Sequence, residues 1–145
     1  MSHYISIDPG NKKCGLLLAD IQSRKVAEAG ISSLHKFSDL VSLWNKNYQI
    51  KKIIIGDGTN SNYIENELKR KNFFNINYVN EKGSTLRARF RYWEIWPPNY
   101  FIRWLPKKML LPPENLDAVV ALILLEDFLK CSFNWPEKVN IKIWT

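Results

Sequence analysis

The sequence predicts an α/β domain built on one mixed, five-stranded β-sheet with helices on both of its faces. The first observation is a run of three short strand-like segments, at residues 4–8, 15–20 and 25–31, joined by turns rich in Gly, Asn, Ser and Asp. This pattern is typical of an antiparallel meander. The second observation is that helical spacing then alternates with short apolar runs. Such an order adds parallel strands with helical connections.

The next elements follow from the spacing of apolar side chains. A first helix is indicated by residues that recur three or four positions apart, namely Leu34, Phe37, Leu40, Val41 and Trp44. A β-branched strand is expected over 51–55, a polar helix over 60–71 and an alternating strand over 74–79. These strands would complete the five-stranded sheet.

The last third of the chain predicts two helices. The first begins near Ser84, which can cap it, and carries Leu86, Phe90 and Trp93 on one stripe. The second, over 115–130, is apolar on nearly every side and is expected to be buried against the sheet. The tail after Cys131 is expected to be a loose strand or an arm. With no internal repeat or linker, residues 1–145 are interpreted as one domain.

The composition limits the class of protein. The chain has 145 residues, 46% of them hydrophobic, and 21 Lys and Arg against 14 Asp and Glu, for a net charge of +7. A basic surplus favours an anionic partner, most simply nucleic acid. Two cysteines, no signal peptide and no apolar run long enough for a membrane span predict a cytoplasmic protein.

Four of the acids stand at the ends of expected strands or at a helix start. Asp8 closes the first strand, Asp57 and Glu81 follow the fourth and fifth, and Asp117 lies in the first turn of the apolar helix. Each has an ordinary structural explanation as well, since Asp is common in turns and at helix N-termini. Together, however, they occupy the places where a mixed sheet gathers functional groups. Glu114 is a weaker companion of Asp117.

Oxygen ligands of this kind suit Mg²⁺ or Mn²⁺. His3 and His35 have no partner at metal-ligand spacing, so zinc is not expected. Two metal ions held by three or four carboxylates can activate a water molecule and stabilise the leaving oxygen of a phosphodiester. The acids therefore predict a metal-dependent phosphodiesterase.

Three short segments occur in a characteristic order: Ile5-Ser6-Ile7-Asp8-Pro9-Gly10, Asn80-Glu81-Lys82-Gly83-Ser84-Thr85 and Asp117-Ala118-Val119-Val120-Ala121. In sequence and in order they resemble the YqgF (RuvX) branch of the RuvC-type Holliday junction resolvases and pre-16S rRNA nucleases. The resemblance, closest to cyanobacterial and plastid members, implies an RNase H-like fold. It also implies Mg²⁺ or Mn²⁺ held by Asp8, Glu81 and Asp117, with Asp57 as a catalytic candidate of lower rank.

The resemblance implies cleavage in pre-16S rRNA 5′-end processing or at Holliday-type junctions, by a monomer or a homodimer. Asn80 and Lys82 stand where the family motif has an acid and an arginine. A nucleic-acid-binding protein without catalysis is therefore the alternative. A phosphate-binding hairpin of actin-like ATPases is disfavoured, because those folds need two such domains and the chain has length for one.

A basic, aromatic stretch is the expected nucleic-acid surface. Between residues 82 and 108 lie seven basic residues and one acid, Glu94. The basic residues are Lys82, Arg87, Arg89, Arg91, Arg103, Lys107 and Lys108. They can neutralise phosphates, and the interleaved aromatics can stack on unpaired bases. We expect Phe90 and Trp93 to be buried and several of Trp96, Tyr100 and Trp104 to be exposed.

Overall fold

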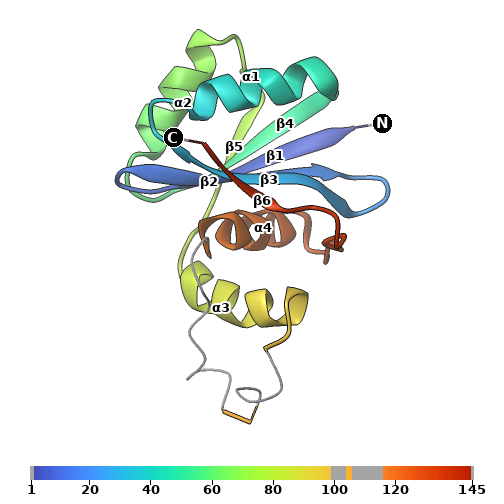
Figure 1. Cartoon of the computed structure of the whole chain (residues 1–145). Helices are drawn as coiled ribbons and strands as arrows, with labels where there is room; N and C mark the ends of the chain where they lie inside the picture. Colours follow the sequence, from blue (N-terminus) through green and yellow to red (C-terminus); the bar gives the residue numbers. More distant parts are fainter. Residues whose placement is uncertain (1, 99–103, 106–115, 145) are drawn as a thin grey trace.

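A computed structural model describes residues 2–98, 104–105 and 116–144 of the chain. Its sheet has six strands in the order β5-β4-β1-β2-β3-β6 (Figure 1). The strands are β1 (His3–Pro9), β2 (Lys13–Asp20), β3 (Lys25–Ser33), β4 (Ile50–Gly56), β5 (Ile76–Val79) and β6 (Ile141–Trp144). The β1–β2 and β2–β3 pairs are antiparallel, whereas β4 pairs in parallel with both β1 and β5. The predicted meander followed by parallel strands is confirmed.

Helices cover both faces of the sheet, as predicted (Figure 1). The helices are α1 (Phe37–Asn47), α2 (Ser61–Arg70), α3 (Ser84–Ile95) and α4 (Leu116–Leu129). One face packs against α1 and α2 through residues such as Ile5, Leu16 and Phe37. The other face packs against α4, and α3 lies on the far side of α4 (Figure 1).

The position of α4 explains why its sequence is apolar on every side. Its Ala118, Ala121 and Leu122 pack on the sheet, while Val119 and Ile123 pack toward α3. A helix with two packed faces has no solvent stripe of the usual width. No helix in the described parts of the chain combines the length and apolar character needed to cross a membrane.

The stripe predicted for α3 is wrong at Leu86, whose side chain is exposed. The face toward α4 is formed instead by Ala88 with the partly buried Tyr92, Ile95 and Trp96. Ser84 and Trp93 are also buried, while Phe90 is half-buried. A small residue at the centre of a helix contact lets the two helices approach closely, and Ala88 serves that purpose. Nor does Ser84 cap the helix: the N-cap residue is Gly83, in the left-handed conformation with φ 74°.

The sixth strand is the other difference from the predicted sheet. The tail after α4 returns along the sheet and pairs in parallel with β3, with Ala29 opposite Ile141. Trp135 and Val139 pack on the α4 side of the sheet on the way. A strand of four residues, fixed by partners more than a hundred positions earlier in the chain, has no strong local pattern.

Candidate active site

The pleat of β1 places Asp8 on the α4 face of the sheet. Two residues earlier, the Ser6 hydroxyl donates a buried hydrogen bond to the Ala121 carbonyl, at 2.7 Å. Two residues along a strand span about 7 Å, and the helical turn from Ala121 back to Asp117 spans about 6 Å. Since β1 and α4 run in opposite directions there, Asp8 and Asp117 lie about equally far from the Ser6–Ala121 hydrogen bond and on the same side of it.

Gly15 permits this approach. It lies opposite Asp8 in the β1–β2 pair. A Cβ atom at Gly15 would overlap the backbone carbonyl of Asp117, so any side chain there would push the first turn of α4 away from the sheet. Glycine is needed at this position for close backbone approach.

Glu81 reaches the same place from the loop after β5. Its carboxylate lies over the backbone of Gly56 and Gly58, where a Cβ atom on either glycine would overlap it. Its Oε1 atom is buried and has no hydrogen-bond partner in the described structure. A buried carboxylate oxygen without a donor is costly. This atom therefore indicates that a ligand completes the site.

Asp57 lies next to Glu81 but has a different position. Its side chain is exposed, and its Oδ1 accepts a hydrogen bond from the Glu81 backbone N–H at 3.1 Å. Its own backbone N–H donates to the Val79 carbonyl at 3.0 Å. Asp57 therefore ties the loops after β4 and β5 together and holds Glu81 in place. A catalytic role for Asp57, which the resemblance ranks below the roles of the other three acids, stays a prediction.

The acids strongly influence one another. Burial, followed by the charges of Glu81 and Asp117, raises the pKa of Asp8 to about 8. Burial also raises the pKa of Glu81. Each carboxyl group lies close enough to affect the pKa of the other, so without a cation the site favours keeping a proton. Such a pair would exchange its proton for a cation.

These residues fit a hard divalent cation, because the site offers only carboxylate oxygens, one of them buried and unpartnered. Within the described residues, however, no three His, Cys, Asp or Glu side chains are already gathered as a set of metal ligands. Asp8 and Glu81 are in contact, and Asp117 is near enough to raise the pKa of Asp8. The structure thus brings the three predicted acids together, and their role as metal ligands remains a prediction.

Asn80 and Lys82, the departures from the family motif, form a local turn. The Asn80 side-chain oxygen accepts a hydrogen bond from the Lys82 backbone N–H at 2.7 Å, a bond that an aspartate would make equally well. Both side chains are exposed. The change to Asn therefore alters the turn little and removes none of the three buried or half-buried acids.

Two residues beside the acids were not singled out from the sequence. The Lys13 ammonium lies 3.7 Å from Oδ2 of Asp117, and only the alternation of side chains along β2 could have indicated this. Cys14 is a buried free thiol on the opposite face, among the residues packed by α1 and α2. Burial raises the pKa of Cys14 to about 12, so it stays protonated and is a poor nucleophile.

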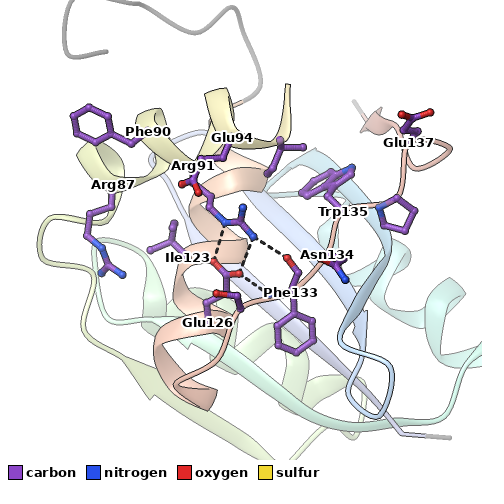
Figure 2. Close-up of a pocket in the computed structure, with 13 residues that line it drawn as sticks. Arg87, Phe90, Arg91, Glu94, Ile123, Glu126, Phe133, Asn134, Trp135 and Glu137 are labelled. Carbon is purple, nitrogen blue, oxygen red and sulfur yellow. Dashed lines mark hydrogen bonds and ion pairs between the residues drawn. The ribbon is translucent and has the colours of Figure 1, made fainter. Parts of the chain in front are cut away.

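Two of the predicted nucleic-acid-binding arginines are engaged with acids of α4. Arg91 donates to Glu126 at 3.2 and 3.0 Å and to the Phe133 carbonyl at 2.7 Å. Figure 2 shows this guanidinium pointing from α3 toward Glu126, inside a cleft of about 900 Å³. Arg87 forms a two-bond ion pair with Asp127. These contacts give both arginines, Arg91 above all, a role in joining α3 to α4.

The remaining basic and aromatic predictions divide by position. Lys82 is exposed and Arg89 half-buried, and neither has an ion pair with another described residue. Trp93 is buried and Trp104 is 76% exposed, both as expected, whereas Trp96 is half-buried. Outside the described residues lie Tyr100, Arg103, Lys107, Lys108 and Glu114.

Comparison with known proteins gives a match of fold. No family model and no curated protein sequence matches the chain. Among solved structures, RuvC of T. thermophilus in complex with Holliday junction substrate matches with a TM-score of 0.51 and 10% identity, over 90% of this chain and 95% of that one. At this identity the likeness concerns the fold alone, and it shows that the chain has the predicted RNase H-like fold.

Two Aquifex aeolicus structures of the Ppx/GppA family also match, each with 14% identity and a TM-score of 0.35. They cover 63% and 68% of this chain and 41% of their own. A likeness this low carries no argument.

Proposed function

We propose that this protein is a divalent-metal-dependent endonuclease that hydrolyses phosphodiester bonds in structured nucleic acid. The observation that carries the proposal is the half-buried Asp8–Glu81 carboxyl pair, with one buried Glu81 oxygen that lacks any described hydrogen-bond donor. A pair of this kind is an expensive feature to keep in a fold, and perturbed carboxyl groups are typical of functional sites.

Each acid has a distinct part in the proposed site. Asp8, Glu81 and Asp117 would hold Mg²⁺ or Mn²⁺, and Asp57 would position Glu81 through the bond to its backbone N–H. The bound ion would supply an activated water molecule and stabilise the charge on the leaving oxygen. The protein's own contribution is to fix carboxylates from β1, α4 and the loop after β5 on one rigid base.

Two substrates are supported, for different reasons. The RuvC neighbour was determined with a Holliday junction substrate, which favours branched DNA. The motifs at Asp8, Glu81 and Asp117 resemble those of the YqgF branch, which favours pre-16S rRNA 5′ ends. Of these we favour rRNA processing in the cytoplasm. Lys82 and Arg89 have no ion pair with another described residue, so their charges are available to phosphates.

Cleavage of two labelled substrates tests the proposal. A four-way DNA junction and a pre-16S rRNA end fragment are incubated with Mg²⁺, with Mn²⁺ and with EDTA. Asp39→Asn is the matched control for Asp8→Asn, because Asp39 is exposed on α1. We expect metal-dependent cleavage that Asp8→Asn lowers more than about a hundredfold and Asp39→Asn leaves unchanged. If neither substrate is cut while salt-sensitive binding persists, the protein is the non-catalytic binder.

A further inference from the structure

Lys13 projects toward the acids because of its place in β2. It precedes Gly15 by two residues, and alternate residues of a strand share a face. Gly15 faces the first turn of α4, where its Cβ would meet Asp117. The Lys13 ammonium accordingly lies 3.7 Å from Asp117 Oδ2, with 61% of the lysine side chain exposed.

The backbone beneath Lys13 is fixed, whereas the side chain is free to move. A Cβ atom at Gly10 would overlap the Lys13 carbonyl, so the hairpin is tight. The Asn60 side chain donates to the Gly10 carbonyl at 2.8 Å, and the Leu34 N–H donates to the Lys12 carbonyl at 3.3 Å. An ion pair that is open to solvent is weak, so Lys13 can leave Asp117 easily.

We propose that Lys13 pairs with Asp117 in the cation-free protein and moves to a phosphate of the substrate when a divalent cation takes its place. The inference rests on the proposed function. A divalent ion at Asp8, Glu81 and Asp117 satisfies Asp117 and repels the ammonium. The freed ammonium stays at the mouth of the site on its flexible stem, where it can meet a phosphate oxygen as a point charge.

Lys12 provides a matched control. It is the adjacent residue, it is also an exposed lysine, and it lines a different hollow together with His35 and Tyr63. Lys12→Met changes the net charge by the same amount as Lys13→Met. A difference between the two variants therefore reports the position of Lys13 and not the loss of one positive charge.

The first test is titration of the cation-free protein with Mn²⁺ by calorimetry. Because Lys13 competes with the ion for Asp117, we expect Lys13→Met to bind Mn²⁺ about two- to fivefold more tightly. Lys12→Met is expected to stay within about 1.5-fold of the unmodified protein. Equal or weaker Mn²⁺ affinity in Lys13→Met would overturn the competition.

The second test is the salt dependence of binding to a four-way DNA junction, in EDTA and in Ca²⁺, with the junction checked for integrity afterwards. Loss of one phosphate contact lowers the slope of log K against log salt by about one. We expect this loss for Lys13→Met in Ca²⁺ but not in EDTA, where Asp117 retains the lysine. The same change in both conditions, or in neither, would overturn the transfer to phosphate.

Neither test requires cleavage. If the protein binds Mn²⁺ and the junction as described but never cuts, the nuclease proposal fails and the role of Lys13 stands. If cleavage occurs but Lys13→Met changes the salt-dependence slope equally in EDTA and in Ca²⁺, or in neither, the nuclease proposal stands and the role of Lys13 fails.

Discussion

Partly buried carboxylates lie at both ends of α4, but their surroundings differ. Toward its C-terminal end, Glu126 accepts two hydrogen bonds from Arg91 and one from the Phe133 backbone N–H. At its N-terminal end, burial and neighbouring acids raise the pKa of Asp8 to about 8, and Oε1 of Glu81 is buried without a described partner. Among the described residues, the carboxylate at one end has a cation and hydrogen-bond donors, whereas a carboxylate oxygen at the other end has neither.

The difference separates structural charges from candidate functional ones. A buried carboxylate with its cation and its hydrogen bonds is explained by packing between α3 and α4. Among the described residues, a group of carboxylates that raise one another's pKa has only the exposed Lys13 ammonium beside it, so packing alone does not explain it. The contrast also reassigns Arg91, whose basic charge alone indicated a nucleic-acid contact.

The largest expected effect on stability comes from removing the cation of the Arg91–Glu126 ion pair. Arg91→Met leaves Glu126, whose side chain is only 12% exposed, without its cation, and unpairing a buried ion pair costs about 3–5 kcal/mol. Urea unfolding of the variant should show this loss of stability. Adding Glu126→Gln, which removes the charge but keeps an acceptor for the Phe133 N–H, should recover more than half of it. A single variant as stable as the unmodified protein would contradict the structural role of the pair.

The next largest effect on stability is expected from Mn²⁺ binding to the acids near the N-terminal end of α4. At a Mn²⁺ concentration a hundred times its dissociation constant, binding adds about 2.7 kcal/mol to the free energy of unfolding. Thermal unfolding with Mn²⁺ and with EDTA measures it. We expect Asp8→Asn to lose most of the gain and Asp39→Asn to keep it. Equal stabilisation of all three proteins would place the ion elsewhere.

Removing the Asp8 charge should stabilise the cation-free protein. Because the pKa of Asp8 is raised from 3.8 to about 8, the folded state binds the proton more tightly than the unfolded state. The stability from this group is therefore full below pH 3.8 and is lost as the pH rises to 8. Asparagine resembles the protonated acid and does not titrate.

Urea unfolding in EDTA tests this sign. At pH 8 Asp8→Asn should exceed the unmodified protein by about 1–2 kcal/mol, and the advantage should shrink toward pH 5. Asp39→Asn, with the same substitution at an exposed site, should show no such trend. If Asp8→Asn is the less stable protein at pH 8, the acids are not in the state described here.

The smallest effect on stability is expected from Gly58→Ala. The added Cβ would overlap the Glu81 carboxylate, which is the end of a flexible side chain and can move aside. The free energy of unfolding should fall by less than about 1 kcal/mol, while Mn²⁺ affinity falls about tenfold or more. Calorimetry on the folded variant checks this. A variant with normal Mn²⁺ affinity would show that the position of Glu81 over Gly58 is unimportant.

Most of the fold could be predicted because its signals are local. The strand ends at Asp8 and Glu81 and the buried helix beginning near Asp117 follow from short periodic segments, and the sheet then brings them together. The pairing of β6 with β3 and the contact of α3 through Ala88 both depend on partners distant in the sequence. The spacing of apolar residues therefore predicted neither the sixth strand of the sheet nor the buried face of α3. The Arg91–Glu126 pair is similarly hidden, since it joins residues 35 positions apart.

The most direct test of the proposed function is junction and rRNA cleavage in Mn²⁺ by Glu81→Gln. The control is Glu67→Gln on α2, which packs on the opposite face of the sheet from α4. Glutamine keeps the shape of the side chain over Gly56 and Gly58 and removes its charge. The metal-site proposal predicts a folded Glu81→Gln protein that cuts neither substrate, while Glu67→Gln cuts as the unmodified protein does. Cleavage by Glu81→Gln at the unmodified rate would contradict it.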